Sequence, residues 1–560
     1  MINDIPFIKS LKLTTNQLLI YTCLYITFIL NIPFISKTVS IIAALTHYNL
    51  LFLISVPFLL LSLIIIIQCF FSFKWITKPL LILIVLLSSI LFYATHNYGI
   101  IFDYGMIQNT VETDTAEALS YFNLSAIFFF LVFGVIPSII IAKVQLTYSS
   151  FFGELFARLK LVAASVTVIV LIAIAFYSSY ASVGRNNPNL YGYITPYALF
   201  DSAARFIRKN YLYPPLEFKV LDAKPKIVKA ATNKHVTVLV LGETARAQNF
   251  SLNGYDKPTN QYTDKLDVVS FTHVSSCGTA TAVSVPCMFS RLNKENYDKR
   301  IATVQQNAID IIHLAGADVL WISNNNGSCK GVCKRVETFK IATKKNNPLC
   351  DEEYCFDEAL LTPLKQKLTG LTHENTLVVL HMIGSHGPTY YRRYPDKNRI
   401  FTPDCQRSDI QNCSQNELVN TYDNTIAYTD YVLAKIIEEL NSLSEMKDVE
   451  TSMVYISDHG ESLGENGVFL HGLPYAFAPR EQTHVPFIYW ADAIHQKGRA
   501  NCVKEVSNIN ISHDNIFDIL LGEMSIKSII YDEKNNPLSS CKLSSTIAQA
   551  AYESTNIGAK

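Results

Sequence analysis

Long runs of apolar residues fill the first third of the chain, and short apolar runs separated by polar segments fill the rest. A helix needs about 20 residues to cross the hydrocarbon core of a bilayer. Five early runs reach that length: Gln17–Ser36, Leu50–Phe71, Trp75–Ala94, Tyr121–Ala142 and Leu161–Tyr180. We therefore predict five membrane-spanning helices, and no small-residue cleavage pattern follows the first one to mark it as a signal peptide.

From His235 onward, β-branched runs alternate with helical patterns. Short, fully apolar runs bounded by turns are typical of strands buried on both faces of a parallel sheet. These runs are VTVLVLG, VLWIS, NTLVVLHMIG, SMVYISDHG and VPFIYW. Helical stretches such as Ile301–Ala315 and Glu417–Leu443 are long enough to connect such strands. The predicted fold class is an α-helical membrane domain followed by a soluble, doubly wound α/β domain.

We divide the chain into a membrane domain (1–180), a linker (181–234) and a soluble domain (235–560). The linker is rich in proline and tyrosine, and within residues 199–207 the apolar side chains repeat at helical spacing. With basic residues on the rest of the turn, this pattern predicts a helix lying among lipid headgroups. A helix packed on the soluble domain is the alternative.

The charged residues indicate which partners the chain can bind and how it is oriented in the membrane. The chain has 47 basic and 47 acidic residues and no basic patch with interleaved aromatics, so nothing indicates a nucleic-acid partner. Lysines and arginines gather before the first run, between the second and third, and between the fourth and fifth. By the positive-inside rule the N-terminus is cytoplasmic, and five crossings place the soluble domain on the opposite side.

Ten of the twelve cysteines follow residue 276, which suits an oxidising compartment. Local spacing predicts five disulfides: Cys277–Cys287, Cys329–Cys333, Cys350–Cys355, Cys405–Cys413 and Cys502–Cys541. A zinc knuckle at Cys329 and Cys333 is the alternative, but no second pair at zinc-finger spacing accompanies it. Cys23 and Cys69 lie within apolar runs and are interpreted as core residues.

Four candidate metal ligands lie at or after strand-like runs: Glu243, Thr281, Asp458 and His459. The carboxyl ends of parallel strands meet at one edge of a sheet, where these side chains can converge. Two carboxylates, an imidazole and a hydroxyl suit a tetrahedral zinc site, and the imidazole favours zinc over manganese or magnesium. Metal coordination would also activate Thr281 as a nucleophile. The alternatives are ordinary helix N-caps at Glu243 and Thr281, or Thr279 as the nucleophile.

Two histidines outside this set are candidates for binding a phosphoryl group or a second metal. His386 lies in the tight G-S-H-G context and His471 in FLHGLPY. His381, inside a predicted strand, is interpreted as structural, as are His484 and His495.

Several separated motifs together resemble the lipid A phosphoethanolamine transferases, the family that includes the mobile colistin-resistance enzymes. The motifs are GETARAQNFSLNGY, SCGTATAVSVPCMFS, LHMIGSHGPTYYRRYP and YISDHGESLGENGVFLHG, together with the cysteine pairs. The resemblance covers essentially the whole chain. Its broader relatives are the alkaline phosphatase and sulfatase superfamily.

The resemblance implies a zinc ion held by Glu243, Thr281, Asp458 and His459, with Thr281 as the nucleophile. It also implies that His386 and His471 bind the substrate phosphoryl group or a second zinc ion. From NNNGSCKG it adds Asn326 and Lys330 to the substrate site, which the residue patterns alone do not indicate.

The implied reaction transfers phosphoethanolamine from phosphatidylethanolamine to lipid A or lipooligosaccharide through a phosphothreonine intermediate, giving resistance to polymyxin and other cationic peptides. The chain would act as a monomer in the bacterial inner membrane, with its catalytic domain in the periplasm. Rival hypotheses are a phosphoglycerol transferase or lipoteichoic acid synthase, a membrane-tethered phosphatase or sulfatase, and a sensor or scaffold that keeps a decayed hydrolase fold.

Overall fold

A computed structural model of the protein describes residues 11–43, 49–113, 123–228, 234–325, 329–343, 347–350, 354–408, 410–447, 449–496 and 498–541. The chain forms two compact units. The first comprises residues 1–107 and 121–209, and the second comprises residues 108–120 and 210–560. The described residues 108–113, which lie between two apolar runs, thus belong with the C-terminal part of the chain.

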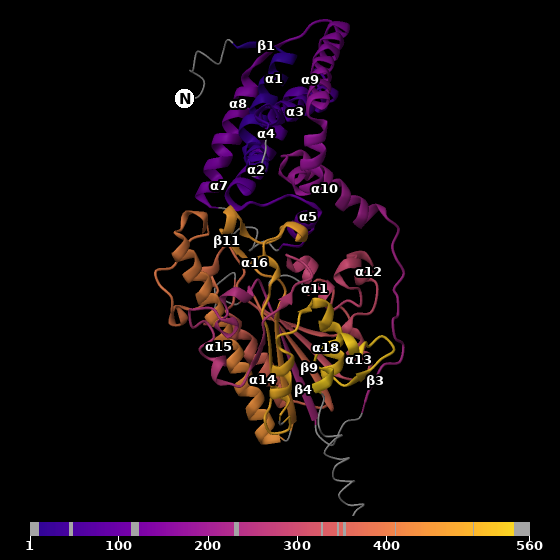
Figure 1. Ribbon diagram of the computed structural model, residues 1–560, viewed down its shortest axis with the longest axis vertical. Coiled ribbons are helices and arrows are strands. Elements are labelled where there is room, and N and C mark those ends of the chain that lie inside the picture. Colours follow the sequence, from indigo (N-terminus) through magenta and orange to yellow (C-terminus); the bar gives the residue numbers. More distant parts are fainter. Residues whose placement is uncertain are drawn as a thin grey trace, which may run out of the picture. The chain divides into compact units, whose positions relative to one another are not determined.

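The first unit is a helical bundle. Among its described residues, four helices are long and apolar enough to cross a membrane: Leu50–Phe70, Thr77–Tyr98, Leu124–Lys143 and Phe151–Tyr177. The first two are α3 and α4, the third runs from α7 to α8, and the last lies within α9 (Phe151–Asn186). Within the bundle α3 packs against α9, and α4 packs against α8 (Figure 1).

The first predicted span is a bent pair of helices rather than one straight helix. Residues 15–30 and Ile32–Ala43 (α2) meet at an angle of 57°. Asn31 lies at the bend, and its side-chain amide donates to the Ile26 and Thr195 carbonyls at 3.0 and 2.9 Å. Pro33 follows and has no backbone N–H to continue the helical ladder. Counting the pair as one span gives five, as predicted.

The helix predicted in the linker is α10 (Tyr197–Ile207), and it belongs to the first unit. The Gln68 side chain of α3 donates a 2.8 Å hydrogen bond to the Tyr197 hydroxyl. Phe200 and Ile207 are about half exposed, at 46% and 50%. A position among lipid headgroups stays a prediction.

The second unit is built on a seven-stranded sheet in the order β5-β13-β10-β4-β9-β7-β8. The strands β10, β4, β9, β7 and β8 are parallel neighbours, while β13 is antiparallel to both β10 and β5. Their bounds are β4 Lys234–Gly242, β5 Val269–Phe271, β7 Asp318–Ser323, β8 Glu337–Lys340, β9 Asn375–His381, β10 Val449–Ser457 and β13 Phe487–Ala491. All five predicted apolar runs are strands of this sheet.

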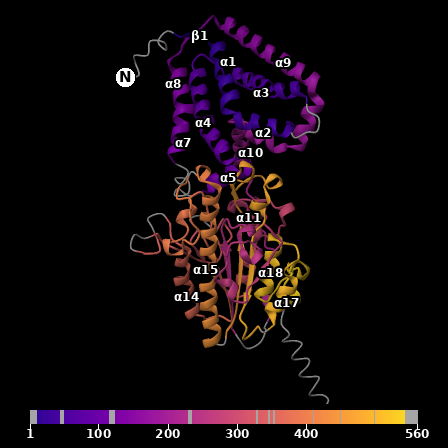
Figure 2. The same ribbon diagram turned by 60° about the vertical axis from the view of Figure 1, so that its left-hand side comes forward.

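Helices cover both faces of the sheet (Figures 1 and 2). On one face lie α14 (Leu361–Thr369) and α15 (Gln415–Lys447), and on the other lie α13 (Ala308–Leu314) and α18 (Ile516–Glu523). The central strands are almost wholly buried between these layers. The predicted doubly wound α/β fold is therefore confirmed.

One predicted connecting helix was wrong in its extent. Residues 301–315 form parts of two short helices, α12 (Lys299–Thr303) and α13. The break falls at Asn307, whose side chain accepts a hydrogen bond from the Asp310 N–H while Asp310 bonds back to the Asn307 N–H. This capping box starts a new helix where apolar periodicity alone suggested a continuous one.

Candidate active site

The sheet register brings two of the predicted ligand segments together. Gly242, the last residue of β4, pairs with Ser457, the last residue of β10. Glu243 and Asp458 are therefore the next residues on two adjacent parallel strands, and His459 follows directly. All three side chains are completely buried.

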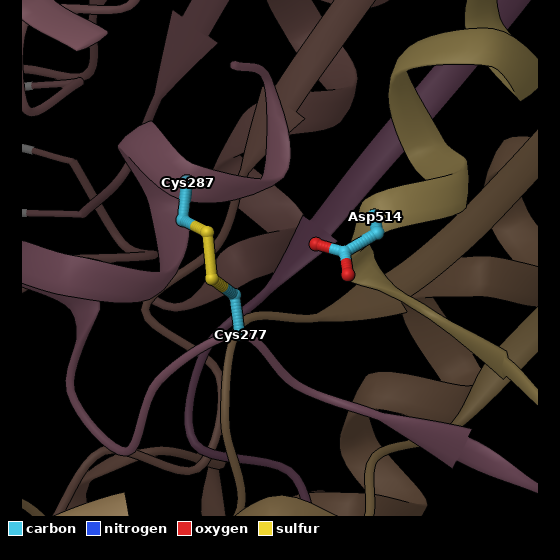
Figure 3. Close-up of side chains that lie close together, drawn as sticks. All are labelled: Cys277, Cys287 and Asp514. Carbon is cyan, nitrogen blue, oxygen red and sulfur yellow. A yellow bond between two sulfur atoms is a disulfide. The ribbon is translucent and has the colours of Figure 1, made fainter. Parts of the chain in front are cut away.

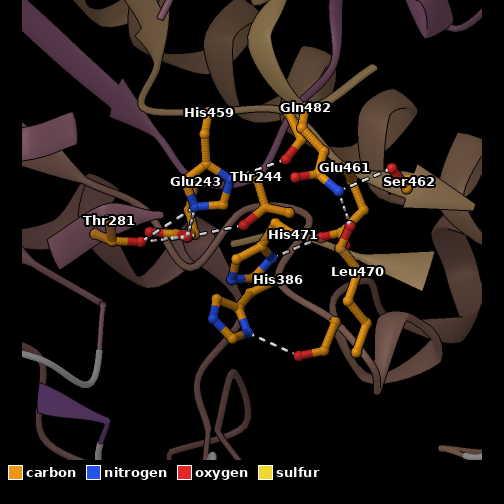
Figure 4. Close-up of polar contacts among 12 residues, drawn as sticks. Glu243, Thr244, Thr281, His386, His459, Glu461, Ser462, Leu470, His471 and Gln482 are labelled. Atoms are coloured by element: carbon orange, nitrogen blue, oxygen red, sulfur yellow. Dashed lines mark hydrogen bonds and ion pairs between the residues drawn. The ribbon is translucent and has the colours of Figure 1, made fainter. Parts of the chain in front are cut away.

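Thr281 reaches the same place from outside the sheet. It is the first residue of α11 (Thr281–Met288), and its hydroxyl donates a 2.9 Å hydrogen bond to Glu243 Oε1. The Thr281 hydroxyl oxygen also lies 3.3 Å from His459 Nε2. His459 Nε2 in turn lies 3.4 Å from Glu243 Oε1 and 3.5 Å from Asp458 Oδ2. In Figure 4, Thr281 and His459 both point toward Glu243.

Neither N-cap alternative fits this geometry. The N-cap of α11 is Ala280, so the Thr281 hydroxyl is not used to cap the helix. Glu243 precedes an irregular turn, and its carboxylate binds Thr281 and the side-chain amide of Asn325 at 2.8 Å. The Thr279 hydroxyl donates to the Leu473 carbonyl at 2.6 Å.

Burial and mutual attraction set the charges of the cluster. Burial alone would raise the pKa of Glu243, but the hydrogen bond and charge of His459 hold that pKa well below its ordinary value. Burial and the Glu243 carboxylate raise the pKa of Asp458 to about 7. The two carboxylates overcome the effect of burial on His459 and raise its pKa to about 10. The cluster therefore attracts positive charge.

The donor set fits a bound metal ion. Ligand atoms of Glu243, Asp458 and His459 all lie within 4.8 Å of one another. Asp458 Oδ1 accepts from the backbone N–H groups of Thr244 and His459. Its Oδ2 is buried and has no hydrogen-bond partner among the described residues. A buried carboxylate oxygen without a donor is costly, and a divalent cation would satisfy it.

Glycine and asparagine residues bring the neighbouring loops close to Glu243. Gly384 follows β9 with a φ of +51°, and a Cβ there would lie 2.5 Å from the Glu243 carbonyl oxygen. The Ser385 N–H donates to that same carbonyl. Asn325, at the end of β7, supplies the amide that binds the Glu243 carboxylate. Only glycine permits this approach of the β9 loop.

The predicted second-site histidines lie beside the cluster. The rings of His459 and His471 are 4.3 Å apart between centroids, and those of His386 and His471 are 5.5 Å apart (Figure 4). His471 Nδ1 lies 3.2 Å from Glu461 Oε2. Burial raises the pKa of Glu461 to about 8 and lowers that of His471 well below its ordinary value.

The remaining predicted residues occupy different positions. His381 ends β9 and is fully buried, with its ring 5.7 Å from that of Trp321. Lys330 Nζ lies 3.3 Å from the Glu112 backbone oxygen, within the second unit. Asn326 lies outside the described residues. Sequence reasoning missed Asn325 and Glu461, although Asn325 adjoins Asn326 and Glu461 lies in the quoted motif YISDHGES.

All five predicted disulfides are present, each within the second unit. Figure 3 shows the Cys277–Cys287 bridge. It joins the segment before Thr281 to α11, the helix that begins with Thr281. Asp514 lies close to both sulfur atoms, but sulfurs bonded to each other are not thiolates. This second acidic and sulfur cluster therefore does not offer the ligands that zinc requires.

Replacing both Cys277 and Cys287 with serine is expected to lower the free energy of unfolding by about 2 to 3 kcal/mol, because the closed loop is short. Activity should fall further than stability alone explains, because the bridge fixes the segment around Thr281. Thermal unfolding and lipid modification by the purified full-length protein would measure both. The matched control is the Cys405→Ser, Cys413→Ser double variant, which opens a loop of similar length. Equal losses of activity in the two variants would contradict this expectation.

Comparison with known proteins identifies the family. Residues 235–526 match the family model described as Sulfatase, and residues 59–211 match the model described as Phosphoethanolamine transferase EptA/EptB. The chain is 38% identical to the phosphoethanolamine transferase EptA of Escherichia coli K12 over 533 residues, which covers 94% of this chain and 96% of that protein. The chain belongs to the phosphoethanolamine transferase family.

Two further relatives support this membership of the phosphoethanolamine transferase family. The phosphatidylethanolamine transferase Mcr-1 of Escherichia coli is 38% identical over 75% of this chain and 79% of its own length. The integral membrane lipooligosaccharide phosphoethanolamine transferase A of Neisseria meningitidis superposes with a TM-score of 0.89 at 34% identity. That superposition covers 95% of this chain and 99% of the solved structure. The likeness thus extends over the membrane and soluble parts of this transferase.

Proposed function

We propose that this transferase moves phosphoethanolamine from phosphatidylethanolamine to lipid A or the lipooligosaccharide headgroup. The observation that carries the proposal is the Thr281 hydroxyl, which lies buried against a carboxylate and an imidazole within a metal-binding donor set. The relatives support the choice of headgroup, since their names specify phosphoethanolamine or phosphatidylethanolamine transfer.

In the first step, the headgroup moves from the donor lipid to Thr281, and several residues of the site take part. The Thr281 oxygen forms a bond to the phosphorus of phosphatidylethanolamine, and its proton passes to Glu243, the acceptor of its hydrogen bond. The bond from phosphorus to the diacylglycerol oxygen breaks, and that oxygen takes a proton from the imidazole of His386. The product is a phosphoethanolamine ester of Thr281.

The second step releases the headgroup. A phosphate or sugar hydroxyl oxygen of the acceptor attacks the ester phosphorus and gives its proton to the His386 imidazole, while the bond to Thr281 breaks and the Thr281 oxygen regains its proton from Glu243. Zinc, held by Glu243, Asp458, His459 and Thr281, would lower the pKa of the hydroxyl and neutralise charge on the phosphoryl oxygens. We propose one such ion, with His386 and His471 as the ligands available to a second.

Placement in the bacterial inner membrane follows from the substrates and the helices. Both donor and acceptor are lipids, and the part of the chain that the structure describes has four apolar helices and a bent pair suited to a bilayer. The five disulfides of the second unit favour an oxidising periplasm. We propose a monomer with a cytoplasmic N-terminus. The added ammonium group would reduce the negative charge of the outer surface and weaken binding of polymyxin.

Mass spectrometry of lipid A from cells expressing the protein tests the proposal. We expect a mass gain of one phosphoethanolamine group and a higher polymyxin concentration needed to stop growth. Purified protein should also release diacylglycerol from phosphatidylethanolamine. Transfer of label from phosphatidylglycerol instead would favour a phosphoglycerol transferase. Release of free phosphoethanolamine without any modified acceptor would favour a plain hydrolase.

A further inference from the structure

His513 is a completely buried histidine that none of the sequence motifs includes. It follows the short strand β14 (Ile511–Ser512), which pairs in parallel with β6 (Val274–Ser275). This pairing places the His513 ring beside Cys277, at the start of the segment that leads to Thr281.

Each ring nitrogen of His513 has a different backbone partner. Nδ1 accepts a 3.1 Å hydrogen bond from the Cys277 N–H, and Nε2 donates a 3.0 Å hydrogen bond to the Ser457 carbonyl. An amide N–H can only donate and a carbonyl can only accept, so the ring must be neutral with its proton on Nε2. Burial agrees with this state, since it lowers the pKa of His513 to about 3.

Ser457 extends the connection to the remaining ligand segment. Its hydroxyl accepts a 2.8 Å hydrogen bond from the Ala245 N–H and donates one of 3.0 Å to the His459 carbonyl. Ala245 lies two residues after Glu243, and Ser457 directly precedes Asp458. The His513–Ser457 pair therefore joins the three chain segments that supply the four candidate metal ligands.

We propose that His513 is a positioning residue that holds the Thr281 segment against the strand end carrying Asp458 and His459. The inference rests on the proposed function, because it takes Thr281 and a bound metal ion to carry out the transfer at this site. The physical reason is that Thr281 comes from outside the sheet, so the strand register does not fix its distance from the other ligands. A rigid aromatic ring with two fixed hydrogen-bond directions supplies that constraint. Replacing a side chain that orients metal ligands in this way typically lowers metal affinity or activity about 10- to 100-fold.

The test uses the full-length protein in detergent with the substitutions His513→Gln and His513→Leu. Glutamine keeps an amide donor for the Ser457 carbonyl but lacks the rigid ring that also holds an acceptor toward Cys277, whereas leucine makes neither bond. Zinc affinity is measured by competition with a chromogenic chelator, and kcat and KM are measured with a fluorescent phosphatidylethanolamine. We expect zinc binding and kcat to weaken about 10- to 100-fold, more in the leucine variant, with KM within about twofold of the wild type.

The matched control is His495→Gln. The Nδ1 atom of His495 lies 3.0 Å from both the Ser444 hydroxyl and the Asp492 carboxylate. Asp492 binds the Thr451 N–H near the start of β10, at the opposite end of the strand from Ser457. The control therefore breaks a partly buried histidine contact without touching the ligand segments.

The outcomes separate the positioning role from the function. If His513→Gln keeps wild-type zinc affinity and kcat, the positioning role is overturned while the proposed function stands. If its losses equal those of His495→Gln, His513 contributes to stability alone and the proposal is likewise overturned. A wild-type protein that neither binds zinc nor modifies lipid would overturn the proposed function and this inference together. If the leucine variant fails to fold, the zinc affinity and kcat of the glutamine variant alone test the positioning role.

Discussion

Replacing Thr281 with alanine is expected to stop phosphoethanolamine transfer, with a loss of at least about a thousandfold in kcat. The Thr281 hydroxyl oxygen is the atom that would carry the headgroup between donor and acceptor. It lies within 3.3 Å of both Glu243 and His459. Alanine leaves the two carboxylates and the imidazole in place, so the protein should keep its fold and most of its zinc affinity.

Two measurements check this expectation. Lipid A from cells expressing the variant should show no phosphoethanolamine gain, and the wild-type protein trapped without acceptor should carry the headgroup on Thr281. The control is Thr279→Ala. Because the Thr279 hydroxyl donates to the Leu473 carbonyl, its removal should reduce stability modestly and leave transfer measurable. Full activity of Thr281→Ala, or a labelled Thr279, would reject the assigned nucleophile.

Removing the metal is expected to abolish activity to a similar degree. A strong chelator should inactivate the purified wild-type protein, and one equivalent of zinc per chain should restore it. The reason is electrostatic: the buried cluster attracts positive charge, and Asp458 Oδ2 has no hydrogen-bond partner among the described residues. Zinc content by mass spectrometry and transfer of a labelled headgroup would be followed together.

The variant Glu243→Gln links this result to the proposed ligands. Glutamine would replace one carboxylate oxygen with an NH₂ group, which would face either the Thr281 hydroxyl or the Asn325 amide, both of them donors, so zinc should not restore activity. The control Glu450→Gln changes a carboxylate near the start of β10, beside His235, and should respond to zinc as the wild type does. Restoration by magnesium alone, or a need for two zinc ions, would contradict the single-zinc site.

Much of the fold was predictable because local patterns encode it. The five strand runs are apolar on both faces, which only a sheet covered by two helical layers can accommodate. The membrane spans followed from run length, but the bend at Asn31 did not. It depends on a hydrogen bond to Thr195, far along the chain. The split of the helix at Asn307 was visible as a capping pattern that apolar periodicity concealed.

The chemistry of the site was partly predictable for a different reason. Acids and a histidine directly after strands converge whenever the strands are parallel neighbours, and β4 and β10 are such neighbours. Asn325 and Glu461 could not be singled out. Asn325 lies in a row of three asparagines, and the end of β7 brings its side-chain amide to Glu243, which the sequence alone does not indicate. Glu461 lies 3.2 Å from His471, a contact that sequence spacing does not specify.

The sequence by itself determined the kinds of element, the cysteine pairs and the residue types available for metal and phosphoryl chemistry. These depend on periodicity, short loops and local motifs. Only the tertiary structure decided which of those residues meet. Strand order sets Glu243 beside Asp458, and the β14–β6 pairing brings His513 between Cys277 and Ser457. Such contacts join residues separated by as many as 236 positions, and burial fixes them by requiring each polar group to find a partner.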